Sequence, residues 1–373
     1  MLPGGVSRDV ALGRLISVAA LGAAACGGCR SSHARGHQAP REAPAPAASS
    51  APAVSSAPAV SDAPAASGAP ADPASTTQGP DAGGSVLARL GFSITHTYKE
   101  RHLAWRQVEK LNWQPVAAGQ PALPSPPPLD SDGCRPGMVH IQGRFLADAK
   151  GRDNNDTVQI AQDRACTHWR THDHGVQGVC ESFDRDRWLE IRKLLGHKRV
   201  NYCIDRYEFP DVYGQFPVVI VTFREAKKYC DKVKKRLCTE NEWTFACEGE
   251  EGVPYPYGYD RDKTACRIDV FGPHPDKDTL RPRMTAHTAK GIDLAWQGLR
   301  SGTSPRCRSP FGVYDMTGNV DEWTKNVRRY GYKMILKGGH WGPARQRCRP
   351  ATRGHGPLYV RWDQGFRCCA DAP

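Results

Sequence analysis

The apolar and polar residues between 216 and 252 predict a strand followed by two helices. The run "FPVVIVTF" is apolar over consecutive positions, as in a buried strand. Downstream of it, apolar residues recur at i, i+3, i+4 and i+7 and form one face of a helix: Ala226, Tyr229, Cys230 and Val233. Thr239, with Glu242 three residues later, forms a capping box, which predicts that a second helix starts there.

The remainder of the C-terminal part alternates short apolar runs with Gly and Pro. "MVHIQGRF" and "YCIDRYEFP" are expected to be strands, separated by a polar insertion at 148–200. After residue 252, short strands and loops are punctuated by Gly and Pro. This pattern predicts a loop-rich α+β domain over 134–373.

Residues 86–133 have a weaker pattern. Five apolar residues are only loosely periodic: Leu90, Ile94, Leu103, Trp105 and Val108. The segment "PALPSPPPLD" follows and breaks any regular element. We expect a helical spacer over 86–133.

Residues 39–85 are almost wholly Ala, Pro, Ser and Gly. Such a composition has few bulky apolar side chains to offset the entropy lost on ordering, so it predicts a disordered tether.

The first 26 residues are typical of an export signal. Arg8 and Arg14 precede the apolar run "LISVAALGAAAC", which is too short to span a bilayer. We expect a signal peptide over 1–25 and lipidation of Cys26 as in a bacterial lipoprotein, with 26–38 as the anchored start. The alternative is cleavage by signal peptidase after the alanines at 23–25, without lipid.

Cysteine usage agrees with export. The chain has 14 Cys and no close Cys-x-x-Cys pairs after residue 130, which favours disulfides in an oxidising compartment over zinc sites. Proximity suggests Cys166 with Cys180 and Cys266 with Cys307, but the connectivity cannot be read from sequence. The predicted location is the cell envelope, periplasmic or surface.

The net charge of +12 adds little about function. Basic residues are scattered singly and match no nucleic-acid-binding motif, so a solvated basic surface is expected rather than a DNA or RNA partner.

Five motifs of residues 134–371 occur in the order seen in one known family. They are "PVVIVTFREAKKYC…KRLCTENEWTFACEG", "YPYG", "FGVYDMTGNVDEWT", "KGGHW" and "GFRC". With them the chain resembles the formylglycine-generating enzymes, or sulfatase-modifying factors. The resemblance implies a compact, irregular fold related to C-type-lectin-like domains, in which the glycines of "GGHWG" serve close backbone packing.

The resemblance also implies one calcium site. Asp315, Gly318, Val320 and Glu322 match the positions where the family binds calcium, with carboxylates at the ends and backbone carbonyls between them. Calcium prefers six to eight oxygen ligands, which suits such a turn. The alternative is a turn whose acids only cap backbone donors. A second family site is not expected, because Arg267 replaces a ligand there.

Copper is not expected. The family oxidises a substrate cysteine with copper held by two thiols just after the double glycine, whereas "GGHWGPARQRCRPATR" contains only Cys348. Counted from Gly339, Cys348 falls on the second copper thiol. Counted back from "GFRC", it falls on a structural half-cystine, and this count is preferred. A single soft thiolate does not form the copper site in either case.

The same resemblance pairs Cys230 with Cys368 and Cys247 with Cys348. The catalytic candidates that remain are Cys348, His340 and His355, the histidines for proton transfer. Three further histidines are interpreted as a polar loop rather than an iron site, and three Trp as packing residues: His168, His172, His174, Trp323, Trp341 and Trp362.

Two functions are therefore expected. The first is an exported, lipid-anchored protein that keeps the family scaffold and binds a peptide or an envelope polymer. The alternative is an oxygen-dependent metal oxidase of the same family, with another ligand set around Cys348, His340 and His355.

Overall fold

The computed structural model describes residues 85–116, 133–152, 155–170, 178–326 and 333–373, and the single positions 123, 126 and 128. The expected signal peptide, Cys26, the lipid-anchored start and nearly all of the tether lie outside these residues. So do His172 and His174.

The expected helical spacer is wrong. Only α1 (Val86–Arg89) is helical, and the segment after it forms an antiparallel sheet in the order β1-β2-β3: β1 (Ile94–Lys99), β2 (Ala104–Val108) and β3 (Asn112–Val116). Thr, Tyr, Trp and Val in this stretch favour strands, and Glu109 and Lys110 adopt positive φ to turn the chain between β2 and β3.

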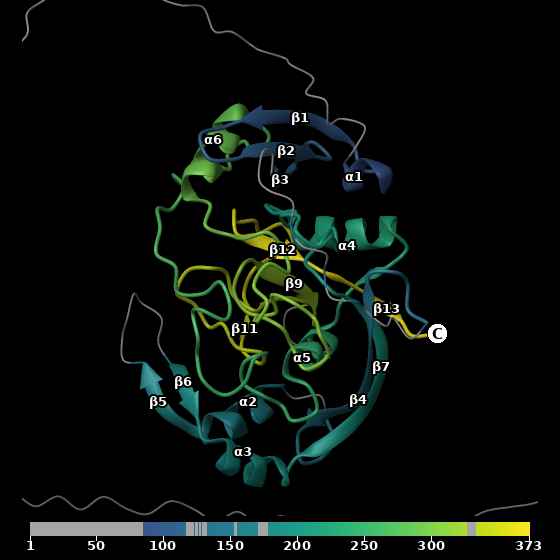
Figure 1. The fold of residues 1–373 in the computed structure, drawn as a ribbon, viewed down its shortest axis with the longest axis vertical. Coiled ribbons are helices and arrows are strands. Elements are labelled where there is room, and N and C mark those ends of the chain that lie inside the picture. The colour runs from purple at the N-terminus through teal and green to yellow at the C-terminus, as the bar shows by residue number, and fades with distance from the viewer. Residues whose placement is uncertain are drawn as a thin grey trace, which may run out of the picture. The chain divides into compact units, whose positions relative to one another are not determined.

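This small sheet belongs to the globular domain. Trp105 and Trp113 are fully buried in a cluster with Phe216, Trp296 and Trp341, and Val108 packs with residues of α4. The domain therefore includes 85–116 and does not begin at Cys134. Figure 1 shows β1–β3 above α4 at one end of the domain.

The second sheet has the order β4-β7-β13-β8. The strand expected at "MVHIQGRF" is confirmed, whereas the one expected at "YCIDRYEFP" begins earlier, at Gly196, and ends at Asp205. The two strands pair antiparallel from Met138 opposite Asp205 to Ala147 opposite Gly196. The members are β4 (Met138–Ala147), β7 (Gly196–Asp205), β8 (Arg236–Leu237) and β13 (Cys368–Asp371).

The third sheet has the order β11-β10-β9-β12, with β12 parallel to β9 and the other pairs antiparallel. Its strands are β9 (Asp321–Lys325), β10 (Met334–Lys337), β11 (Ala351–Thr352) and β12 (Gln364–Phe366). The residues of the "GNVDEWT", "KGGHW" and "GFRC" motifs lie on or beside these strands, so this sheet brings together the segments that carry the candidate site.

The two helices predicted from periodicity and capping are confirmed as α4 (Phe223–Lys232) and α5 (Glu240–Glu248). Both begin with a complete capping box, Thr222 with Glu225 and Thr239 with Glu242. Ala226, Tyr229 and Cys230 are buried on the inner face of α4. A further helix, α6 (Ala286–Ala295), covers part of the Trp-rich cluster.

The polar insertion folds into a small peripheral unit. It contains α2 (Asn155–Asp163), β5 (Cys166–Arg170), β6 (Val179–Phe183) and α3 (Arg185–Arg192). Trp188 and Phe183 form the core of this unit together with Tyr255.

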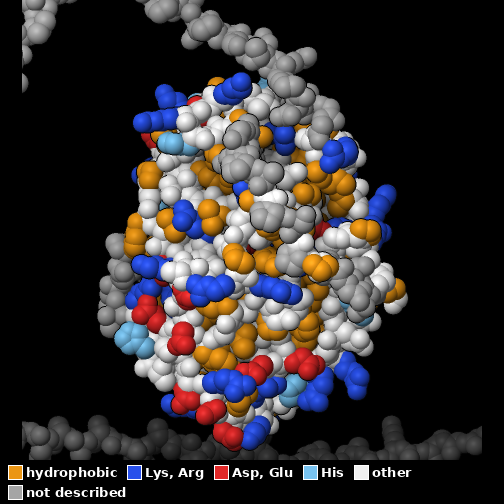
Figure 2. All heavy atoms as spheres, viewed as in Figure 1, with side chains coloured by type: hydrophobic (Ala, Val, Ile, Leu, Met, Phe, Trp, Pro, Cys, Tyr) orange, Lys and Arg blue, Asp and Glu red, His pale blue; other side chains and the backbone are white. Residues whose placement is uncertain are grey.

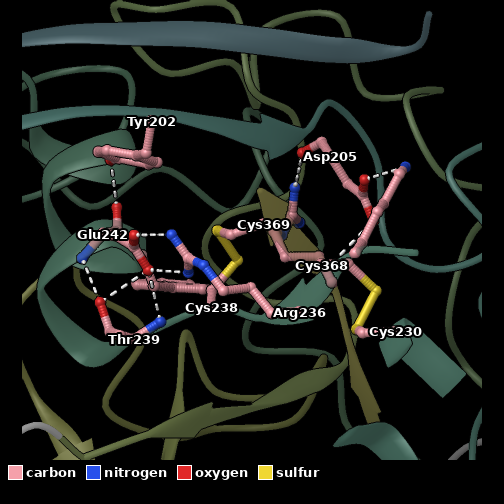
Figure 3. Close-up of a disulfide and its surroundings, with 12 residues drawn as sticks. Tyr202, Asp205, Cys230, Arg236, Cys238, Thr239, Glu242, Cys368 and Cys369 are labelled. Carbon is pink, nitrogen blue, oxygen red and sulfur yellow. Dashed lines mark hydrogen bonds and ion pairs between the residues drawn. A yellow bond between two sulfur atoms is a disulfide. The ribbon is translucent and has the colours of Figure 1, made fainter. Parts of the chain in front are cut away.

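Every described cysteine forms a disulfide. The pairs implied by the resemblance, Cys230–Cys368 and Cys247–Cys348, are both present, as are the two pairs suggested by proximity. The other two are Cys134–Cys203 and Cys238–Cys369. Figure 3 shows how the adjacent Cys368 and Cys369 tie β13 to α4 and to the start of the α5 segment. Six disulfides are typical of a protein from an oxidising compartment.

The structure shows no bilayer-crossing helix within the residues it describes, since none is both long and apolar enough.

Candidate functional site

The turn over residues 315–322 connects the loop region to β9. Asp315, Gly318 and Asn319 all adopt positive φ, so the backbone doubles back within a few residues. Glycine is required at 318, because a Cβ there would lie 2.2 Å from the carbonyl oxygen of Arg267. The four expected calcium ligands therefore share one tight, buried turn.

Two buried carboxylates beside this turn are bound by neutral donors. Glu208 Oε2 accepts from Ser301 Oγ and from Asn319 Nδ2, each at 2.7 Å. Asp315 Oδ2 accepts from the backbone N–H of Gly302 at 2.6 Å. Burial raises the pKa of Glu208 well above its ordinary value. Burial also raises the pKa of Asp315 to about 7, although the hydrogen bond from the N–H of Gly302 acts to lower it.

Glu322 is bound by a guanidinium instead. Arg367, itself fully buried, donates from Nη2 to Oε1 at 2.6 Å and from Nε to Oε2 at 2.8 Å, and Trp243 Nε1 adds a bond at 2.9 Å. This bidentate geometry is the strong form of the Arg–carboxylate pair.

The donor set suits a hard cation in chemistry and charge. When ionised, Glu208, Asp315 and Glu322 bring three negative charges to a region where Arg367 supplies one positive charge. Glu322 is already paired with Arg367, so within the described part of the chain Glu208 and Asp315 are the carboxylates of this set without a cationic partner, and Asp315 is the one that lies on the turn. Among the described residues no three His, Cys, Asp or Glu side chains are arranged to hold a metal alone, so carbonyls such as those of Gly318 and Val320 would complete the shell. Arg267, at the second family site, donates to the carbonyl of Gln297 at 2.6 Å.

A second group of charges surrounds the double glycine. Arg345 Nη2 lies 3.1 Å from both carboxylate oxygens of Asp321, and Arg361 Nη2 lies 2.6 Å from Asp363 Oδ2. His340 is between these pairs, with Nε2 3.5 Å from Asp363 Oδ2. Its Nδ1 accepts from the N–H of Gly342 at 2.8 Å, which assigns the ring proton to Nε2.

The histidine of this group is held in its neutral form. Burial lowers the pKa of His340 and outweighs the opposing effect of Asp363. His355 is nearer the surface and stacks on Tyr359, with ring centroids 3.7 Å apart. Burial lowers the pKa of His355 as well. Both candidates therefore lie near one region, but only His340 is bonded into the charged group.

Cys348 is not a catalytic thiol. Its sulfur is bonded to Cys247 and is fully buried, which matches the count that placed it on a structural half-cystine. The expectation that Cys348 could take part in oxidation is therefore wrong, because a disulfide sulfur has no thiolate to offer.

The remaining candidates have structural surroundings. Trp323 donates from Nε1 to the carbonyl of Val221 at 2.8 Å, and Trp341 packs edge-on against Trp296. Trp362 contacts His274 and the guanidinium of Arg361. His168 lies on the exposed strand β5, 3.4 Å from Glu181.

Several residues of the site were missed from sequence. Glu208 is distant in sequence from the 315–322 turn that it joins, and Arg361 and Asp363 are distant from the double glycine. No local sequence pattern indicates that these residues belong to the site. Arg367 is part of the quoted "GFRC" motif, so its position could have suggested a structural role.

Comparisons with known proteins identify the family of the chain. Residues 196–372 match the family model described as "Sulfatase-modifying factor enzyme 1-like domain". The "Formylglycine-generating enzyme" of Mycobacterium tuberculosis is 34% identical over 54% of this chain and 67% of its own length. The chain belongs to the formylglycine-generating enzyme family of sulfatase-modifying factors.

Other relatives differ in the function that their names state. The "Inactive C-alpha-formylglycine-generating enzyme 2" of Bos taurus is 34% identical over 42% of this chain and 51% of its own length. The "Serine/threonine-protein kinase pkn1" of Chlamydia caviae is 26% identical over 51% of this chain and 29% of its own. The chain thus spans about half, or less, of these two relatives. The crystal structure of CarF aligns with 66% of this chain and 99% of its own, at 14% identity and a TM-score of 0.39, which is too weak a likeness for any inference.

Proposed function

We propose that this protein is an exported, lipid-anchored member of the family that binds a peptide or an envelope polymer and does not carry out copper-dependent oxidation. The observation that carries the proposal is the Cys247–Cys348 disulfide. It engages Cys348, the one cysteine in the loop just after the double glycine, so that loop presents no thiol.

The physical argument is one of ligand type. Copper(I) is selected by soft thiolates, and the family site needs two of them on one loop. The groups that follow the double glycine here are the neutral imidazole of His340, the cationic Arg345 and their carboxylate partners, and none of them is a thiolate. The bovine relative adds support, because its name describes a member of this family as inactive in formylglycine generation.

Oxidation of a sulfatase-type peptide tests this proposal. The purified chain is incubated with a Cys-containing peptide, copper and oxygen, and formylglycine is measured by mass spectrometry against an active family member. We expect no product above the rate of copper alone. Robust turnover would overturn the proposal and favour the oxidase.

The lipid anchor is carried by Cys26 and the apolar run before it. Labelling of cells with a clickable fatty acid should mark the full chain and not the Cys26→Ser variant. Equal labelling of both, or labelling of neither, contradicts the anchor.

Calcium at the 315–322 turn is supported by the buried carboxylates that exceed Arg367 in number. We expect added calcium to raise the melting temperature relative to chelator, by an amount equivalent to about 2.7 kcal/mol at a hundred times the dissociation constant. Asp315→Ala should abolish the shift, whereas Asp315→Asn, which keeps an oxygen ligand, should retain part of it. No shift in the wild type, or the same shift in Asp315→Ala, would reject this site.

A further inference from the structure

A groove of about 410 Å³ lies between the outer strand of the third sheet and the peripheral unit. One wall is the segment that contains Arg345, Arg347 and Arg353, and the other includes Ile160 of α2 and Val179 of β6. We call this cavity the arginine groove. Since its two walls come from segments nearly two hundred residues apart, only the folded chain forms it.

Each of the three arginines is held by at least one carboxylate. Arg345 is paired with Asp321, and Arg347 Nη2 lies 2.7 Å from Asp163 Oδ1. Arg353 Nη2 lies 2.8 Å from Asp156 Oδ1 and 3.4 Å from Oε1 of the buried Glu240. These pairs fix the guanidinium groups in place but use few of their N–H donors. A guanidinium has five donors and stays protonated in proteins.

Several of the remaining donors have no partner. The Nε atoms of all three arginines, and also Nη1 of Arg347, are buried without a hydrogen bond. Arg347 is only 3% exposed, and its guanidinium lies 5.0 Å from the centre of the Phe183 ring. A buried donor without an acceptor costs about 1–3 kcal/mol. These atoms are themselves closed to solvent, so the donors that a ligand in the groove can reach are the Nη groups of Arg345 and Arg353, whose side chains are 25% and 31% exposed.

A further arginine near this groove has its hydrogen-bond donors paired. Arg261 is also buried, but its Nε and Nη2 form two bonds of 2.8 Å to Asp269, and it donates to Gln346. It holds the 344–346 segment and has a structural role. Among the described residues, Arg349 and Arg361 also have a buried Nε without a partner and do not line the groove, so what sets the groove apart is that three such arginines line one cavity.

The sheet edge adds a second recognition element. β11 is the outer strand of the order β11-β10-β9-β12 and pairs with β10 alone. Its residue Ala351 lines the groove. An outer strand presents backbone N–H and C=O groups that can pair with an extended chain. The side chain of Ile160, 60% exposed, offers an apolar contact on the opposite wall.

The face drawn in Figure 2 shows Lys and Arg side chains lying beside hydrophobic ones across the middle of the domain. In the groove itself, arginines lie opposite the apolar side chains of Ile160 and Val179, which fits a partner with acidic and apolar side chains better than a uniformly charged polymer. Carboxylates match the planar donors of arginine, and an extended backbone matches the strand edge.

We propose that the arginine groove binds an extended peptide segment with acidic side chains, whose carboxylates meet Arg345 and Arg353 while its backbone pairs with β11. The proposal rests on the proposed function of a peptide-binding protein and names the class of peptide. An anionic polymer without a peptide backbone is the alternative occupant, which the experiment below separates.

The test is fluorescence anisotropy with the full chain and a labelled peptide of alternating glutamate and valine. We expect saturable binding that weakens at least tenfold, or about 1.4 kcal/mol, when glutamine replaces glutamate. A peptide with N-methyl groups on one edge should also bind more weakly, because it keeps the charge but lacks backbone donors. Polyphosphate should compete poorly.

The variants are Arg347→Met and Arg353→Gln, with Arg224→Gln as the matched control. Arg353 is 31% exposed at its side chain, so its loss should leave the fold intact even if Arg347→Met does not. We expect about a tenfold loss of affinity for Arg353→Gln and little change for Arg224→Gln, which removes one charge from an exposed residue outside the groove.

The outcomes separate the two proposals. If the glutamine peptide binds equally well and the groove variants have no effect, the groove proposal is wrong while peptide binding stands. If N-methylation has no effect and polyphosphate displaces the peptide at lower concentration, the occupant is an anionic polymer and the peptide assignment is wrong. If neither peptides nor polymers bind, the proposed function fails as well.

Discussion

The 315–322 turn and the arginine groove both contain buried charged groups and lie close to the third sheet, but they differ in which group is in surplus. At the turn, Glu208, Asp315 and Glu322 outnumber their one guanidinium partner, Arg367. At the groove, each arginine has a carboxylate partner, and the surplus is one of N–H donors.

The difference shows how acids and arginines respond to burial. A buried carboxylate can take up a proton, and the raised pKa of Asp315, about 7, reflects this. A guanidinium cannot lose its proton at accessible pH, so its free donors can be satisfied only by an acceptor. Without a ligand, the carboxylates of the turn can therefore be neutralised by protons. The unpaired N–H donors of the groove arginines stay unfavourable until an acceptor group or a water molecule binds them.

The largest expected effect comes from removing the guanidinium of Arg367, which pairs with Glu322 beside the turn. Arg367→Met leaves Glu322 buried without its partner and should destabilise the protein by about 3–5 kcal/mol. Urea unfolding, followed by tryptophan fluorescence, measures the change. If calcium binds the turn, adding it should restore part of the loss. A loss below about 1 kcal/mol would mean that Arg367 is not what neutralises the turn.

A smaller effect is expected at Asp269, which is bonded to both Arg261 and Arg170. Burial would raise its pKa, but the hydrogen bonds from Arg261 and Arg170 outweigh this and lower the pKa to about 2. A shift from the ordinary value of 3.8 corresponds to about 2 kcal/mol of stability. Asp269→Asn should lose about this amount in urea unfolding at neutral pH, while Glu190→Gln, an exposed ion-pair control, should change little.

The same pair of arginines predicts a pH dependence. Because the pKa of Asp269 is lower in the folded than in the unfolded chain, its contribution is complete above about pH 4 and is lost as the pH falls towards 2. The difference in unfolding free energy between wild type and Asp269→Asn should therefore shrink over this window. A constant difference would show that the carboxylate charge is not the cause.

The smallest effect is expected for Arg347→Met, which is the groove's counterpart of Arg367→Met. Arg347 is as buried as Arg367, but its partner Asp163 is 25% exposed and can be rehydrated, and two of its donors are unpaired. We expect a change of about 1 kcal/mol or less in the same urea assay. A loss as large as that of Arg367→Met would indicate a structural arginine and would remove the contrast between the two regions.

Local patterns predicted much of the C-terminal fold. The period of Ala226, Tyr229 and Cys230 and the capping box at Thr239 correctly located α4 and α5, because these signals depend on neighbours within one turn of helix. The pairings of Cys230 with Cys368 and of Cys247 with Cys348 followed from the family resemblance, not from local pattern. The spacer around Trp105 was misread, because its partners lie in distant segments.

The sequence by itself determined α4, α5, the family and the absence of a second thiol in the loop of Cys348. It did not determine the strand expected over 216–223, where only Val219 forms an isolated β-bridge. Tertiary structure alone decided that Glu208 joins the 315–322 turn and that the arginines of one loop face α2 and β6 across a groove. Both depend on contacts between residues about a hundred or more positions apart. Such contacts follow from how whole surfaces are buried together, which no local run of residues specifies.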